Sequence, residues 1–140
     1  MDDEAAVPPP PQGFAPSAGR GPFTSLNGPI YHRLDGEVLQ HAFFPLERHT
    51  NGLGLVHGGM LSTFMDGVLA AAVGRSLRRR AVTIHLSIDF LNMGRAGEWI
   101  LGEGRVTRAT QAVAFAEGRA FVGPRDLIRV SGVFKLMRAR

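Results

Sequence analysis

One long apolar segment with a single acid constrains the fold of this chain more than any other feature. Residues 58–77 carry large apolar side chains at helical spacings, alanine and glycine fill much of the remainder, and Asp66 is the only acid among them. Because so little of this helix is polar, we expect it to be buried on most sides. One helix cannot cover both faces of a sheet, so the simplest arrangement is a curved sheet wrapped around it. The outer face or an edge of that sheet then remains for association.

Five segments have the character of β-strands and supply that sheet. Residues 37–46 precede the helix, and four further segments follow it, at 81–92, 99–108, 112–121 and 127–137. In the segment 81–92, apolar and polar residues alternate, which predicts that Thr83 faces the same way as His85. Short connections between the last four segments predict that these strands pair as antiparallel neighbours. The order of elements is that of an α+β fold.

The chain divides into an arm and one domain. Residues 1–22 hold six of the nine prolines, together with glycine, alanine and serine, which predicts a flexible arm. The remaining residues, 23–140, are enough for a single domain with a core. A short helix is possible before the turn at Asn27-Gly28-Pro29. The acidic N-terminus lacks the basic end and apolar core of a secretory signal.

Composition and charge exclude several classes of function. The chain has no cysteine, which excludes disulfides, a thiol nucleophile and thiolate metal sites and fits a cytoplasmic location. No apolar run reaches the roughly 18–20 residues that span a bilayer, so no membrane segment is expected. The net charge is +4, but the arginines are scattered, so nucleic acid is not expected as a partner. No histidines or acids stand at metal-ligand spacing, and no metal is expected.

The helix and its start carry the residues best suited to chemistry. A lone carboxylate such as Asp66 costs several kcal/mol to bury unless it is paired, hydrogen-bonded or protonated, which favours a functional role. The alternative is a buried Asp satisfied by nearby donors. Gly58 and Gly59 follow His57 where the helix begins, and their backbone N–H groups can hold an anionic oxygen without a Cβ in the way. The alternative for these glycines is a helix-entry turn.

Several motifs occur together in this chain. They are Asn51, the segment GLVHGG at 54–59, Asp66 seven residues after Gly59, the block FLN at 90–92 with Gly97-Glu98, and the segments 28–31 and 131–135. With the order of elements, they resemble the hotdog-fold acyl-CoA thioesterases of the type found in phenylacetate degradation, over residues 24–137. The resemblance implies a hotdog fold, with an antiparallel sheet of about five to six strands wrapped around one long central helix. It also implies an acyl-CoA substrate and no cofactor.

If the chain hydrolyses thioesters, each of these residues has an expected role. Asp66 is either the general base that activates water or the nucleophile that forms a mixed anhydride, and the sequence leaves both open. Asn51 orients the water or the substrate carbonyl, or is an ordinary turn residue. His57 is a hydrogen-bonding residue at the helix start rather than the base. Thr83 matches a position where the family often carries a hydroxyl and holds the attacking water, or is an ordinary strand residue.

The spacing of the two motifs along the helix predicts that the sites are shared between chains. Asp66 lies eight residues after Gly58, about 12 Å along the axis at 1.5 Å per residue. One chain therefore cannot bring both to the same thioester carbon. Antiparallel helices in a twofold dimer would place Asp66 of one chain opposite Gly58 of the other. The family resemblance implies the same arrangement, often as a dimer of dimers.

Other interpretations and other contacts remain open. A hydratase or dehydratase on the same fold is one alternative, and a non-catalytic acyl-CoA-binding protein is another, although Asp66 argues against the latter. Candidates for contacts to the phosphates of coenzyme A are Arg78, Arg79, Arg80, Arg95, Arg108 and Arg125. Candidates for an apolar acyl pocket, which are equally suited to the core, are Leu53, Leu55, Met60, Phe64 and Met65.

Overall fold

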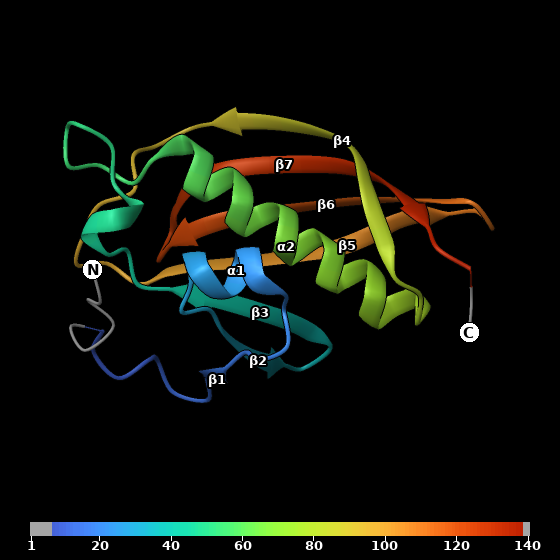
Figure 1. Ribbon diagram of the computed structural model, residues 1–140, viewed down its shortest axis with the longest axis horizontal. Helices are drawn as coiled ribbons and strands as arrows, with labels where there is room; N and C mark the ends of the chain where they lie inside the picture. The colour runs from blue at the N-terminus through green and yellow to red at the C-terminus, as the bar shows by residue number, and fades with distance from the viewer. Residues whose placement is uncertain (1–6, 139–140) are drawn as a thin grey trace.

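The computed structural model describes residues 7–138 and has the predicted α+β hotdog architecture, with a sheet arched around one long helix (Figure 1). The antiparallel sheet has seven strands, more than the five to six expected. The helices are α1 (Pro22–Asn27) and α2 (Gly58–Leu77), with a short 3-10 helix at Glu47–His49. The strands are β1 (Ala15–Pro16), β2 (Tyr31–Asp35), β3 (Val38–Phe43), β4 (Ala81–Phe90), β5 (Ile100–Ala109), β6 (Val113–Val122) and β7 (Arg125–Leu136).

The two unpredicted strands lie at the N-terminal edge of the sheet. β2 forms a hairpin with β3, and the two-residue β1 pairs with β2. β2 is short and none of its residues is fully buried, so it lacks a clear apolar alternation in the sequence. In the segment expected to be a flexible arm, Phe14 is buried beneath the guanidinium of Arg33, 4.5 Å from the ring centroid. Residues 1–6 of that expected arm lie outside the described part of the chain.

The order of strands corrects one prediction about pairing. β5, β6 and β7 are antiparallel neighbours in chain order, but β4 pairs with β7 and β5 pairs with β3. The prediction that β4 lies beside β5 is therefore wrong. The connecting residues 91–99 cross the end of the sheet, where Leu91 donates to the carbonyl of Leu127 at 2.8 Å and Gly94 accepts from Val56 at 2.9 Å. As a result β4 forms an edge of the sheet.

Glycines let α2 lie directly on the backbone of the sheet. A Cβ added at Gly102 would come within 2.7 Å of the Phe64 ring, and one at Gly104 within 2.8 Å of Leu69. Gly118 lies beneath the same leucine, at 3.0 Å. Leu69 is fully buried in this depression, and so the side of α2 that faces the sheet is fixed by close contact.

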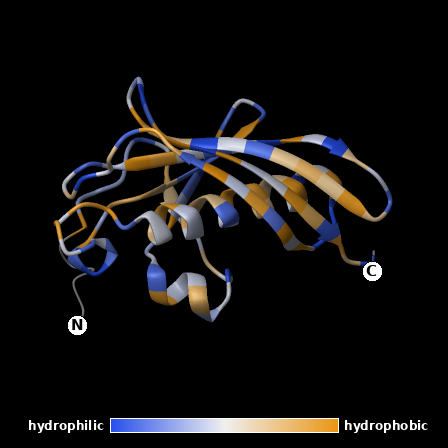
Figure 2. Ribbon diagram, turned by 90° about the horizontal axis from the view of Figure 1, so that it is seen from above, coloured by the Kyte–Doolittle hydropathy of each residue, from blue (hydrophilic) through white to orange (hydrophobic). Residues whose placement is uncertain are grey.

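The opposite side of α2 is less buried than the sequence predicts. Seven residues of the helix are buried, but Ser62, Thr63, Asp66, Gly67 and Ala70 are only half-buried. Figure 2 shows α1 lying on this side of α2, away from the sheet. Within the described residues, no helix has both the length and the apolar character needed to cross a lipid bilayer.

The close contact of α2 with Gly102, Gly104 and Gly118 leads to a testable prediction about stability. Gly118→Ala places a methyl group against a backbone atom, the oxygen of Glu103, and against the fully buried side chain of Leu69. We expect a loss of about 1–3 kcal/mol in the free energy of unfolding, measured by denaturant titration. The matched control is Gly52→Ala, where nothing lies within 4 Å of the added Cβ, and it should stay within about 0.5 kcal/mol of wild type. Equal losses in both variants would contradict the close-packing account.

Candidate active site

The two glycines at the start of α2 have different surroundings. His57 is the N-cap residue, and its Nδ1 accepts a hydrogen bond of 2.7 Å from the N–H of Gly59. A Cβ at Gly59 would lie 2.9 Å from that nitrogen, so this cap requires glycine. The N–H of Gly59 is thus already engaged, whereas that of Gly58 has no acceptor among the described residues. Gly58 therefore provides the amide best placed to meet a ligand oxygen, with the helix N-terminus behind it.

Asn51 both closes the loop before α2 and presents a free donor. Its Oδ1 accepts hydrogen bonds from the N–H groups of Leu53 at 2.9 Å and Leu55 at 3.1 Å. These bonds fix the orientation of the amide. Its Nδ2 has no acceptor in the part of the chain that the structure describes. The turn role and the donor role considered for Asn51 are therefore compatible within one side chain.

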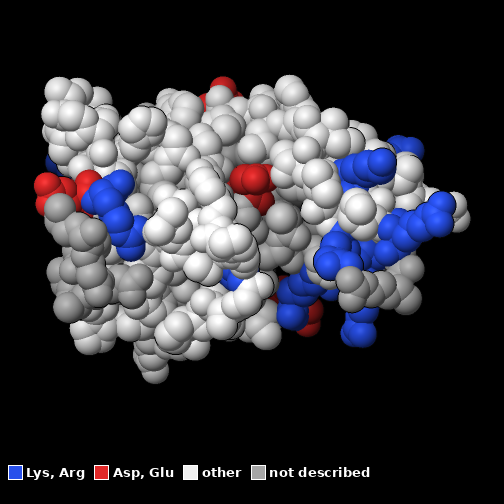
Figure 3. Space-filling model, in the orientation of Figure 1, with Lys and Arg blue, Asp and Glu red and all other residues white. Residues whose placement is uncertain are grey.

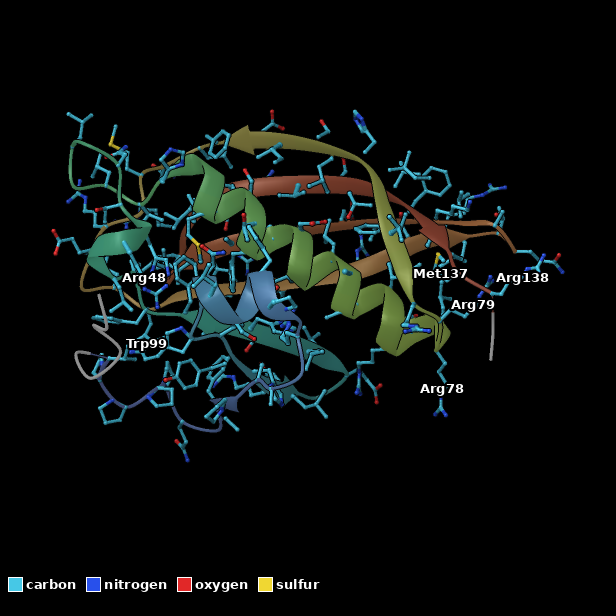
Figure 4. All side chains as sticks on the ribbon, in the orientation of Figure 1. Arg48, Arg78, Arg79, Trp99, Met137 and Arg138 are labelled. Carbon is cyan, nitrogen blue, oxygen red and sulfur yellow. The ribbon has the colours of Figure 1, made fainter. Side chains whose placement is uncertain are left out.

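His49 holds this loop in place, and the sequence pattern does not predict this role. It is 3% exposed, its Nδ1 accepts from the N–H of Leu46 at 2.9 Å, and its Nε2 lies 2.8 Å from the carbonyl oxygen of Asn27. Its own carbonyl accepts from the N–H of His57 at 2.8 Å. The neighbouring Arg48, labelled in Figure 4, reaches the end of α1 through the carbonyl of Leu26. A single histidine in a loop carries no pattern, so only the folded contacts show its role.

Asp66 is joined to β4 by a short hydrogen bond. The hydroxyl of Thr83 donates to Oδ1 of Asp66 at 2.6 Å, and both residues are half-buried. The predicted alternation of β4 is wrong at this point, because the register against β7 shifts between Thr83 and His85. This bulge turns Thr83 to the helix side of the sheet, on which Leu86 also lies, and so aims its hydroxyl at Asp66. The structure thus brings together two of the predicted site residues.

The predicted residues form two clusters rather than one. Asp66 and Thr83 lie near the start of β4, whereas Gly58 packs against Phe90 at its end, with a Cβ at Gly58 falling 3.2 Å from the ring. Asn51 and His57 belong to the second cluster. Eight residues of continuous helix separate the two clusters, about 12 Å along the axis. Both clusters lie along the same edge strand.

The remaining candidates differ in what they contact. Basic side chains gather at the end of the molecule where α2 terminates (Figure 3). Arg79 has a structural role there, because its guanidinium donates to the carbonyls of Met137 and Gln111. Arg125, at the start of β7, forms an ion pair with Glu98 at 2.8 Å. Of the apolar candidates, Met65 is fully buried in the core. Within residues 7–138, no three acidic or histidine side chains gather to hold a metal ion.

Comparison with known sequences establishes the family. The sequence model of the Thioesterase superfamily matches residues 53–128. The "Putative esterase PA0474" of Pseudomonas aeruginosa is 38% identical over 129 residues, which cover 90% of this chain and 96% of that protein. Acyl-coenzyme A thioesterase 13 of Mus musculus is 30% identical over 71 residues, 50% of this chain and 51% of that protein. The chain belongs to the thioesterase superfamily and is a thioester hydrolase, as predicted.

Solved structures share the fold. A phenylacetic acid degradation-related protein of Ralstonia eutropha superposes with a TM-score of 0.73 at 22% identity, covering 82% of this chain and 90% of its own. A hypothetical thioesterase protein of Streptococcus pneumoniae, solved with coenzyme A, superposes with a TM-score of 0.71 at 18% identity, covering 79% and 90%. These structures confirm the predicted hotdog fold.

Asn51 allows its two roles to be separated by mutation. Asn51→Asp keeps an acceptor for the N–H groups of Leu53 and Leu55 but removes the Nδ2 donor. We expect its melting temperature to stay near that of wild type while kcat for thioester hydrolysis falls about 10²–10³-fold, the usual effect of losing a donor to the developing oxyanion. Asn51→Ala should lower both quantities. Full activity in Asn51→Asp would contradict the donor role and leave Asn51 with the structural role of closing the loop.

Proposed function

We propose that this chain is an acyl-CoA thioesterase that hydrolyses a small, medium-chain or aryl acyl-CoA to the free acid and coenzyme A. The observation that carries the proposal is the hydrogen bond from Thr83 to Asp66, which fixes a carboxylate on the open side of α2. The name of the mouse relative and the coenzyme A in the streptococcal structure support this substrate class. The absence of cysteine fits the cytoplasm, which we propose as the location.

The geometry around Asp66 suits either route of hydrolysis. With Oδ1 held by Thr83, Oδ2 has no hydrogen-bond partner among the described residues and is available for chemistry. As a general base, the carboxylate takes a proton from water while the water oxygen attacks the thioester carbon. As a nucleophile, it attacks that carbon itself and forms an anhydride that water then cleaves. In both routes the carbon–sulfur bond breaks and the thiolate of coenzyme A leaves.

The carbonyl oxygen needs a donor that the same chain does not supply near Asp66. The N–H of Gly58 is such a donor, but it lies two helical turns away. We propose that Gly58 of the partner subunit binds the developing oxyanion, with Asn51 beside it. Each dimer then holds two sites, and each site uses residues of both chains.

The edge strand β4 supports this dimer. Among the described residues β4 pairs only with β7, and its apolar side chains Val82 and Ile84 are 55% and 58% exposed. A long edge with exposed apolar residues is rarely left open in a monomer. If two copies of β4 pair antiparallel about an axis through Ser87, and the bulge between Thr83 and His85 takes up one extra residue, Thr83 faces Phe90 of the partner subunit. Asp66 and Gly58 of the partner subunit, which pack beside those residues, then approach each other.

Release of free thiol from a panel of acyl-CoAs tests this function. Wild type should release coenzyme A, and Asp66→Ala should lower kcat/KM by at least about 10²-fold, because the base or nucleophile is gone. The control is Asp35→Ala, which removes an exposed carboxylate in the β2–β3 hairpin and should leave the rate unchanged. A common background rate in wild type and Asp66→Ala would remove the thioesterase proposal and favour a non-catalytic acyl-CoA-binding protein.

A further inference from the structure

The loop of residues 49–57 carries one proposed oxyanion donor and ends at the other. The N–H of His57 donates to the carbonyl of His49 at 2.8 Å and closes the loop at its base. Asn51 lies two residues after one side of this base, and Gly58 directly follows the other side. The relative position of the Asn51 side chain and the Gly58 amide therefore depends on the pair His49–His57.

The ring of His49 fixes this base to the body of the protein. It is 3% exposed and packs edge-on against Phe43, with 5.7 Å between the ring centroids. The N–H of Leu46 donates to Nδ1 at 2.9 Å, so the neutral ring carries its proton on Nε2. Nε2 then donates to the carbonyl of Asn27 at 2.8 Å. Both ring nitrogens are engaged within the protein, so the ring takes no part in proton transfer to a substrate.

The support that this ring reaches is the C-terminal end of α1. The last carbonyls of a helix have no partner within the helix and require donors from elsewhere. Arg48, labelled in Figure 4, donates to the carbonyl of Leu26 at 2.9 Å and to that of Gly28. His49 donates to the carbonyl of Asn27, which lies between them. Since α1 has no basic residue in its own last turn, two adjacent side chains before the loop supply all three donors.

A second set of contacts leads from His49 to the start of α2. The backbone N–H of His57 is held by the carbonyl of His49, and its Nδ1 accepts from the N–H of Gly59 at 2.7 Å. His57 is thereby fixed from both sides. The amide of Gly58, which lies between these two bonds, is held in one orientation and has no acceptor among the described residues.

We propose that His49 is a positioning residue, which holds Asn51 and Gly58 at the spacing that a developing oxyanion requires. The inference rests on the proposed thioesterase function and adds α1, through His49, as the support of its oxyanion donors. Such donors act over a narrow range of distances, about 2.7–3.1 Å, and the oxyanion develops only on the way to the transition state. A shift of the loop therefore lowers kcat and leaves KM nearly unchanged.

Two substitutions of His49 separate its hydrogen bonds. His49→Asn keeps an acceptor for the N–H of Leu46 but is too short to reach the carbonyl of Asn27, whereas His49→Gln can reach both. We expect kcat for thiol release to fall about 10–100-fold in His49→Asn, with KM within about twofold of wild type. In His49→Gln, kcat should recover to within about threefold of wild type.

The matched control is His41→Gln. His41 is as deeply buried as His49, at 3% exposed, but no hydrogen bond joins it to the loop in the part of the chain that the structure describes. Its substitution should leave kcat unchanged at a temperature at which all variants are folded. A fall of kcat in His41→Gln equal to that in His49→Asn would overturn the inference.

A double-mutant cycle shows whether His49 acts through the oxyanion donors. In the Asn51→Asp background one of the two donors is already lost. The factor by which His49→Asn lowers kcat should therefore be at least about threefold smaller there than in the wild-type background. Equal factors in the two backgrounds would mean that the two residues act independently and would overturn the inference.

Stability and function are measured separately. A His49→Asn variant that melts earlier but keeps its kcat would overturn the inference and leave His49 as part of the core. If His49→Asn does not fold, Arg48→Met decides by the same changes in kcat and KM, because it removes the other two links to α1. Asp66-dependent release of thiol by wild type supports the thioesterase function whichever way His49 behaves, whereas no release from any acyl-CoA would overturn both.

Discussion

The close approach of α2 to the sheet is the constraint on which the rest of the structure depends. Gly102, Gly104 and Gly118 remove the side chains that would otherwise hold the helix away from the strands, and Leu69 fills the depression that they leave. Since one side of the helix is fixed in this way, the opposite side is fixed as well. That side carries Asp66 and Gly67, and it is covered only in part, by the segment around α1.

The same constraint separates the two halves of the site. A straight helix of 20 residues cannot fold back to bring its first turn to its third, so Gly58 and Asp66 stay about 12 Å apart. Both clusters instead lie along β4, an edge strand with exposed apolar side chains. The proposed pairing of two such edges would solve two problems at once, because it covers the open strand and completes the two sites.

Local sequence pattern and spacing predict the main helix, most strands and the separation of the two motifs. The features that they do not predict depend on contacts between residues far apart in the chain. The helix of residues 58–77, the strands that follow it and the separation of Asp66 from Gly58 depend on neighbours in sequence, and the structure has the helix with those bounds. The pairing of β4 with β7, by contrast, depends on how residues 91–99 cross the sheet, which alternation does not encode. Simple alternation puts Thr83 on the wrong face, because one bulged residue reverses the alternation. His49 acts through the backbone carbonyl of Asn27, far along the chain, and no sequence spacing reveals such a contact.

The central claim is that each site uses Asp66 of one chain and Gly58 of the other, and mixed dimers test it most directly. Asp66→Ala and Gly58→Val subunits would carry different tags, be co-expressed, and be purified through both tags, so that each dimer holds one chain of each kind. Each variant alone should be inactive. The account predicts that the mixed dimer recovers about half of the wild-type rate of thiol release, because one of its two sites is built from two unaltered residues. A mixed dimer no more active than either variant alone would contradict the account.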